Sequence, residues 1–109
     1  MTSVEDKFRE VFQKQDGIVA VYFFGSQVKG NTDKFSDYDL AVLFRDGWKA
    51  GNRFYIVGDL LCRVFSVVGQ DNADVVDLSN QPLWFQQVVV KTGRIIYETS
   101  REERISYEQ

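Results

Sequence analysis

The central segment of the chain is AVYFFGSQVKGNTDKFSDYDLAVLF, residues 20–44, in which two apolar runs flank a polar connection. The first run, residues 18–24, is short and rich in β-branched and aromatic residues, so we expect a buried strand rather than a helix. It ends at Gly25-Ser26, and the second run, residues 37–44, again predicts a strand. The segment therefore predicts two strands joined by a turn and a polar loop.

The turn between the two strands has the residue types of a phosphate-binding site. Gly25 allows a ligand to approach the backbone closely. Ser26 supplies a hydroxyl group and is a suitable cap for a short helix over 26–29, whose free N–H groups and dipole favour an anion. Lys29, at the end of that helix, is placed to reach a phosphate, although a solvated lysine fits the pattern equally well. An ordinary strand-to-helix turn remains the alternative interpretation.

Two aspartates, Asp37 and Asp39, stand at the start of the second strand. Side chains at i and i+2 of a strand share a face, so both carboxylates are expected to point the same way. They repel one another unless cations lie between them, and oxygen ligands of this kind suit Mg²⁺. In-line displacement at a nucleotide phosphorus requires a phosphate-binding turn next to a metal-binding site. Alone, such a pair of aspartates is often only a solvated turn.

The order of these residues resembles a known family. Gly25-Ser26, then Gly30, then SDYDL at 36–40 is similar to the signature of the DNA polymerase β-like nucleotidyltransferases. The short chain resembles their minimal branch, the MNT proteins, which are often paired with HEPN-domain toxins. Weaker likeness extends through DVVDL at 74–78 and TGRIIY at 92–97, so the resemblance covers nearly the whole chain.

The resemblance assigns a role to each candidate site residue. It implies that Asp37 and Asp39 bind two Mg²⁺ ions and that Gly25 and Ser26 hold the triphosphate. Asp74 is implied as the third carboxylate, which helps to bind the metal and accepts the proton of the attacking hydroxyl. The rival, Asp77, lies three residues further along the same predicted strand and is therefore expected to face the other side of the sheet.

The implied reaction is transfer of AMP from ATP to a tyrosine hydroxyl of a HEPN-type toxin, with the chain acting as the antitoxin. Two alternatives stay open. The chain could be a catalytically silent antitoxin that blocks its partner sterically, or it could modify a small molecule such as an aminoglycoside. The base preference, the number of nucleotides transferred, and assembly as a homo- or hetero-oligomer are not decided by the sequence.

Composition narrows the class of protein. With 109 residues, 44% hydrophobic and 15% aromatic content, we expect one folded domain over residues 1–109. A net charge of −3 counts against broad nucleic-acid binding. The absence of histidine excludes catalytic triads and His-ligated zinc.

No signal pattern and no apolar run of about 18 residues occurs, which predicts a soluble cytoplasmic protein without membrane contact. Cys62, among apolar residues, is expected to be buried.

The rest of the chain predicts an α/β (α+β) fold of the polymerase β-like kind. We expect a small mixed sheet of about four strands with helices packed mainly on one face. Apolar spacing and Gly or Pro punctuation predict helices over 4–15, 53–68 and 83–92, and strands over 73–78 and 94–98, the latter at the edge of the sheet. The charged tail, 99–109, is expected to form a short helix or to dock on a partner.

Overall fold

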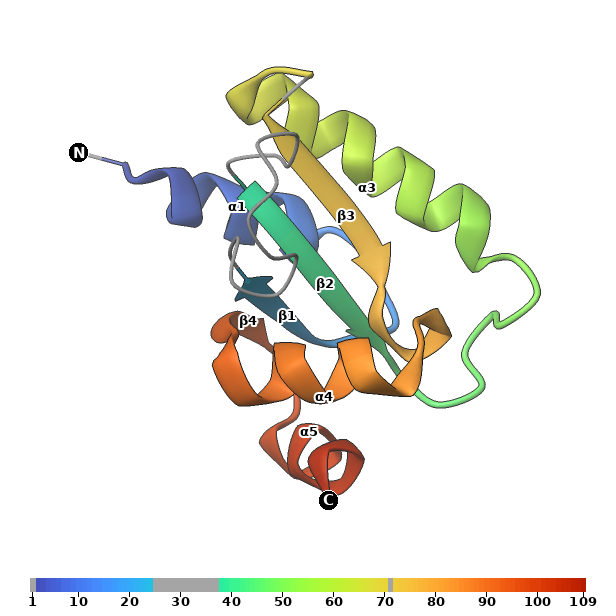
Figure 1. Cartoon of the computed structure of the whole chain (residues 1–109). Helices are drawn as coiled ribbons and strands as arrows, with labels where there is room; N and C mark the ends of the chain where they lie inside the picture. Colours follow the sequence, from blue (N-terminus) through green and yellow to red (C-terminus); the bar gives the residue numbers. More distant parts are fainter. Residues whose placement is uncertain (1, 25–37, 71) are drawn as a thin grey trace.

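The computed structural model describes residues 2–24, 38–70 and 72–109 (Figure 1). The predicted helix over 26–29 and the loop that follows it lie outside these ranges. The elements in chain order are α1 (Val4–Gln13), β1 (Ile18–Phe24), β2 (Tyr38–Phe44), α3 (Arg53–Val68), β3 (Ala73–Asp77), a 3-10 turn η1 (Leu78–Asn80), α4 (Leu83–Thr92), β4 (Arg94–Glu98) and α5 (Arg101–Glu108).

The four strands form one mixed sheet in the order β3-β2-β1-β4. β1 is antiparallel to β2 and to β4, whereas β2 and β3 are parallel and are connected through α3. A parallel pair needs such a crossover because the chain must return to the same end of the sheet. The small mixed sheet and the edge position of the last strand confirm the predicted fold class.

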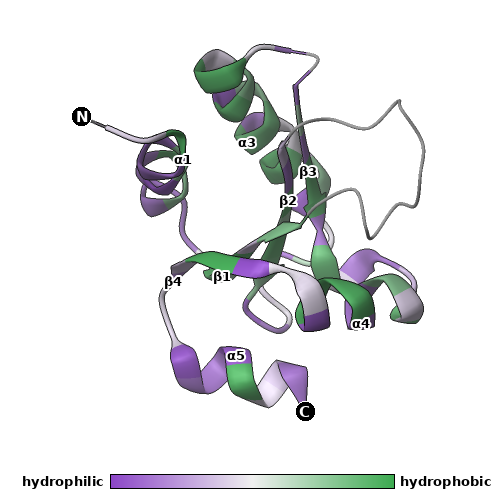
Figure 2. Cartoon of the chain, turned by 60° about the vertical axis from the view of Figure 1, so that its left-hand side comes forward, coloured by the Kyte–Doolittle hydropathy of each residue, from purple (hydrophilic) through white to green (hydrophobic). Residues whose placement is uncertain are grey.

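Helices cover both faces of the sheet, which corrects the expectation that they pack mainly on one (Figure 2). On one face α1 and α3 bury Phe8, Phe12, Leu60 and Val64 against even-numbered residues of β2 and odd-numbered residues of β3. On the other face α4 and α5 cover a second cluster. Its buried members are Val19, Ala20, Tyr22, Phe24, Ala41, Leu43, Leu78 and Val89. The sheet is therefore the middle layer of three.

The C-terminal tail forms the helix α5, which is attached to the rest of the fold mainly by polar contacts. None of its residues is fully buried. The phenol of Tyr22, inside the second cluster, donates a hydrogen bond of 2.6 Å to Glu108. Arg104 is ion-paired with both Glu98 and Glu108. Burial and the nearby Glu108 carboxylate raise the pKa of Tyr22, so this phenol stays protonated and remains a donor.

Cys62 is exposed, so the prediction of a buried thiol was wrong. The buried residues of α3 are Leu60 and Val64, which lie one turn apart on the face toward the sheet. Residue 62 is about 200° around the helix from residue 60, because successive residues turn by about 100°. Leu60 and Val64 therefore face the core, whereas the thiol of Cys62 faces away from it.

The turn between β2 and α3 is held by a close contact between Trp48 and Gly17. Trp48 stacks on Phe44 with ring centroids 5.5 Å apart. A Cβ atom on Gly17 would lie 2.2 Å from the Trp48 ring, and Gly17 has φ of 84°. Only glycine meets both conditions, because a side chain would clash and would strain the backbone. Trp48 thus has a packing role in this structure.

Within the part of the chain that the structure describes, no helix is long and apolar enough to cross a membrane.

Candidate active site

The site is built around Asp39 and Asp74, which the parallel pairing of β2 and β3 places side by side. The register joins Asp39 to Asp74, so their Cα atoms lie on adjacent strands about 4.8 Å apart. Each is the second residue of its strand. In each strand the neighbouring residues, such as Leu40 and Val75, belong to the core under α1 and α3. Alternation therefore directs both carboxylates to the opposite face, the one that α4 covers.

Asp39 is the one buried charged residue among those described, with 1% of its surface exposed. A buried carboxylate is costly unless hydrogen bonds or a cation compensate for the lost hydration. No buried polar side-chain atom in the described ranges lacks a hydrogen-bond partner. Asp39 lies in an otherwise apolar strand, with apolar residues on both sides of it in the sequence. A carboxylate that is buried there despite the cost in free energy is typical of a functional group.

Asp74 is half-buried, and its carboxylate is oriented by its own strand. Its Oδ1 atom accepts a hydrogen bond of 2.9 Å from the backbone N–H of Val75. This contact restricts the side-chain rotamer, so the carboxylate has a preferred direction before any ligand arrives. A positioned carboxylate beside a metal ligand is suited to accept a proton from an attacking hydroxyl.

Asp77, the rival for the third acidic position, belongs to the other face of the sheet. Its Oδ2 lies 3.6 Å from Nη1 of Arg53 in α3, and its Oδ1 accepts a 3.2 Å hydrogen bond from Ser79. Both Arg53 and Asp77 are nearly buried at this contact. The structure therefore brings Asp74 to Asp39 and assigns Asp77 to an internal ion pair.

Four predicted site residues fall outside the described ranges: Gly25, Ser26, Lys29 and Asp37. Their roles in triphosphate and metal binding therefore stay predictions from the sequence. Among the described residues no group of three potential metal-ligating side chains occurs. Two of the three predicted acidic ligands, Asp39 and Asp74, are described.

The residues that are described fit a divalent cation. Asp39 and Asp74 offer carboxylate oxygens, which are the donors that Mg²⁺ prefers. Two negative charges on adjacent strands, one of them out of contact with water, are stabilised by a bound cation. The same burial strengthens the attraction between cation and carboxylate, because the local dielectric constant is low.

An aromatic pair that the sequence analysis did not single out borders the site. Phe24 pairs with Asp39 across the sheet, and its ring meets the edge of the Phe85 ring at 5.4 Å. This apolar wall limits the access of water to the Asp39 side of the sheet. The apolar period of the helix over 83–92 could have identified Phe85 as a core residue, but not as a neighbour of the site. Tyr38, between the candidate ligands, packs against Phe8 on the other face.

A protein-family model matches most of the chain. The model described as Polymerase beta, Nucleotidyltransferase matches residues 6–102 of the chain. The chain belongs to this family. The parallel strands that carry Asp39 and Asp74 lie within the matched range, so the polymerase β-like nucleotidyltransferase fold is established over nearly the whole sequence.

Relatives of known type include a curated protein and several solved structures. The protein adenylyltransferase MntA of Aphanizomenon flos-aquae (strain 2012/KM1/D3) is 26% identical over 92 residues, which is 79% of this chain and 61% of that protein. The chain thus spans about three fifths of the length of this relative. A chain in a crystal structure of a toxin–antitoxin with AMP-PNP is 26% identical, with a TM-score of 0.65 and coverage of 93% of this chain and 78% of that one.

The fold also matches a chain in the structure of a tri-AMPylated Shewanella oneidensis HEPN toxin in complex with MNT antitoxin. The TM-score is 0.64 at 24% identity, with 94% of this chain and 76% of that chain covered. This likeness shows that the polymerase β-like nucleotidyltransferase here has the same architecture.

Proposed function

We propose that the chain is a Mg²⁺-dependent nucleotidyltransferase that transfers AMP from ATP to a tyrosine hydroxyl of a HEPN-type toxin and so acts as its antitoxin. The observation that carries the proposal is the pairing of buried Asp39 with Asp74 on adjacent parallel strands in a chain of this family. The MntA relative supports the transferred group, since its name is protein adenylyltransferase. The toxin–antitoxin structure with AMP-PNP supports ATP as the nucleotide.

In this proposal the acidic residues hold the cations. Asp39 and Asp74, with Asp37 as predicted from the sequence, would bind the divalent cations, and Asp74 would also accept a proton. When bound, Mg²⁺ polarises the α-phosphate and neutralises the charge of the leaving pyrophosphate. Gly25, Ser26 and Lys29 are proposed to hold the triphosphate. Positioning and electrostatic stabilisation then supply most of the rate enhancement.

The proposed reaction forms one P–O bond and breaks another. The tyrosine hydroxyl oxygen attacks the α-phosphorus of ATP and forms a new P–O bond. The bond between the α-phosphorus and the bridging oxygen to the β-phosphate breaks, and pyrophosphate leaves with its electrons. The proton of the hydroxyl passes to a carboxylate oxygen of Asp74, whose orientation is set by the Val75 N–H. The wall of Phe24 and Phe85 keeps water from competing with the hydroxyl.

The proposal is tested by incubating the purified chain, the toxin and Mg²⁺ with ATP that is labelled at either the α- or the γ-phosphorus. We expect label on the toxin from α-labelled ATP only, and mass spectrometry should map AMP to a tyrosine. Label from γ-labelled ATP would indicate phosphorylation and would contradict the proposal. A toxin that is bound and inhibited without any label would favour the steric antitoxin, and modification of an aminoglycoside in place of the toxin would favour the small-molecule enzyme.

A further inference from the structure

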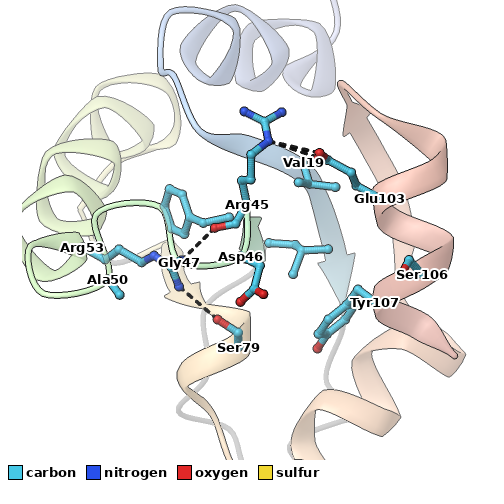
Figure 3. Close-up of a pocket in the computed structure, with 12 residues that line it drawn as sticks. Val19, Arg45, Asp46, Gly47, Ala50, Arg53, Ser79, Glu103, Ser106 and Tyr107 are labelled. Atoms are coloured by element: carbon cyan, nitrogen blue, oxygen red, sulfur yellow. Dashed lines mark hydrogen bonds and ion pairs between the residues drawn. The ribbon is translucent and has the colours of Figure 1, made fainter.

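A cavity of about 590 Å³ lies at the end of the sheet opposite the candidate active site (Figure 3). Val19, Leu43 and Phe44 contribute apolar surface, whereas Asp46, Ser79 and Tyr107 contribute polar groups. Asp39 is near the beginning of β2 and Phe44 is its last residue, so the two sites are separated by roughly 17 Å along the strand. The cavity is therefore distinct from the nucleotide site.

Most charges around the cavity are compensated, and Asp46 is the exception. Arg45 is paired with Glu103 at 3.2 Å, and Arg53 with Asp77 at 3.6 Å. Asp46 makes no ion pair with the other described residues, and Figure 3 shows its carboxylate between Ser79 and Tyr107. The cavity is thus bordered by one exposed carboxylate that has no ion pair with a described residue, next to an apolar floor.

Tyr107 adds a hydrogen-bond acceptor beside this carboxylate. Its hydroxyl donates a bond of 2.5 Å to Gln86, which leaves lone pairs of the phenol oxygen to accept. Burial, with the charges of Glu108 and Asp77, raises the pKa of Tyr107 to about 12, so the phenol stays neutral at physiological pH. A carboxylate and a phenol oxygen over apolar residues are complementary to the cationic head and aliphatic stem of lysine or arginine.

Exposed apolar residues gather at the same end of the fold. Phe54 (82% exposed) and Tyr55 begin α3, and Leu83 and Trp84 (60% exposed) begin α4. Both helices start here because each follows the carboxyl end of a parallel strand, β2 or β3. A hydrogen bond of 3.2 Å from Arg53, the first residue of α3, to Ser79 joins α3 to the turn η1 that precedes α4. We call these four residues, three of which are aromatic, the aromatic rim. Of the five large exposed hydrophobic residues described, only Ile105 lies outside it.

We propose that the cavity and the aromatic rim form the docking surface for the toxin, which inserts a lysine or arginine side chain beside Asp46 and covers Trp84 and Phe54 with apolar residues. The identity of the partner rests on the proposed function. Exposed aromatic patches next to a pocket are typical of protein interaction sites, where a few aromatic anchors carry most of the binding energy.

Charge favours a basic partner over a second copy of this chain. In a two-fold symmetric dimer the same patch meets itself, so one interface would hold two Asp46 carboxylates, neither of them ion-paired with a described residue. Like charges in that position oppose association. A partner with a cationic side chain neutralises Asp46 and removes no existing ion pair, since Arg45 and Arg53 already have partners.

The test is a calorimetric measurement of toxin binding by the wild type, Trp84→Ala, Phe54→Ala and Asp46→Lys. We expect each substitution to weaken binding by at least about tenfold, and the loss in Asp46→Lys to shrink as salt is added. Glu10→Lys is the matched control, because it makes the same charge change at an exposed position of α1 and should leave the affinity unchanged. At saturating toxin the rim variants should recover the wild-type rate of AMP transfer, so KM rises and kcat is retained.

One control variant separates this inference from the proposed function. Asp39→Asn should bind the toxin as tightly as the wild type while it fails to transfer AMP. If all three surface variants bind the toxin with wild-type affinity and AMP transfer is intact, the proposed docking surface is wrong, whereas the proposed enzymatic function is unaffected. A chain that dimerises alone, and that Trp84→Ala makes monomeric, would assign the surface to self-association and also overturn the inference. An absence of both binding and labelling in the wild type would overturn both proposals.

Discussion

Replacement of Asp39 by asparagine is expected to lower the rate of AMP transfer on the order of a thousandfold, the scale of losing one preorganised electrostatic contact in an active site. The substitution conserves size, so the buried position between Tyr38 and Leu40 stays filled. The carboxylate charge that would hold the cation is lost. The rate of toxin labelling from α-labelled ATP, at saturating toxin and Mg²⁺, measures the effect.

Asp77→Asn is the matched control for this prediction. It removes the same charge from the neighbouring strand β3, but on the opposite face of the sheet, where Asp77 is paired with Arg53. We expect AMP transfer at close to the wild-type rate and a loss of about 1–3 kcal/mol in the free energy of unfolding, because Arg53 loses its charged partner. Rates for Asp39→Asn within tenfold of the wild type would contradict the assigned role of Asp39.

Phe8→Ala is expected to lower the free energy of unfolding by about 3–5 kcal/mol, which is the usual cost of removing a fully buried phenylalanine. Phe8 is completely buried between α1 and the sheet, and its ring meets Tyr38 edge-on at 5.5 Å. The change would leave a cavity where α1 and α3 cover the strands. Urea unfolding at equilibrium, with an unchanged m-value, gives the difference directly.

Phe54→Ala is the control for Phe8→Ala, because it is the same substitution at a residue whose side chain is 82% exposed. Its effect on stability should stay within about 0.5 kcal/mol. Equal losses in the two variants would show that the layered core is assigned incorrectly. The same variant serves the docking test, since a loss of toxin affinity without a loss of stability can arise only at the surface.

The sequence predicts the elements well where one physical signal dominates. The apolar run at 18–24 and the helical period over 53–68 match β1 and α3 to the residue. The helix over 83–92 and the edge strand over 94–98 also match. The first helix ends earlier than predicted, at Gln13, and β3 ends at Asp77 because Leu78 begins a 3-10 turn. Local periodicity specifies these elements but not where they pack.

Contacts between distant segments account for what the sequence did not predict. Apolar spacing shows that α4 has a buried side. That α4 covers the face opposite α3 is determined by the path of the chain from β3 through α4 to β4. Tyr22 and Glu108 are 86 residues apart, so no local sequence pattern predicts the hydrogen bond between them. Cys62 was misplaced because its neighbours in sequence are apolar while its own direction on α3 is outward.

The candidate site was predictable in part. The choice of Asp74 over Asp77 followed from strand alternation and family resemblance, and the parallel register of β2 and β3 agrees with it. The depth to which Asp39 is buried depends on packing by α4 and could not be read from the sequence. Gly25, Ser26, Lys29 and Asp37 lie outside the described residues, so their roles stay predictions.

Calorimetric titration with AMP-PNP shows whether Asp39 and Asp74 bind the nucleotide through divalent cations. We expect the wild type to bind AMP-PNP with Mg²⁺ and to lose this binding when the metal is chelated. We also expect Asp39→Asn and Asp74→Asn each to weaken the Mg²⁺-dependent binding by at least about tenfold, while Asp77→Asn binds normally. Equal affinity in all four proteins, or binding that persists without a divalent cation, would show that these two carboxylates do not hold the nucleotide through a metal ion.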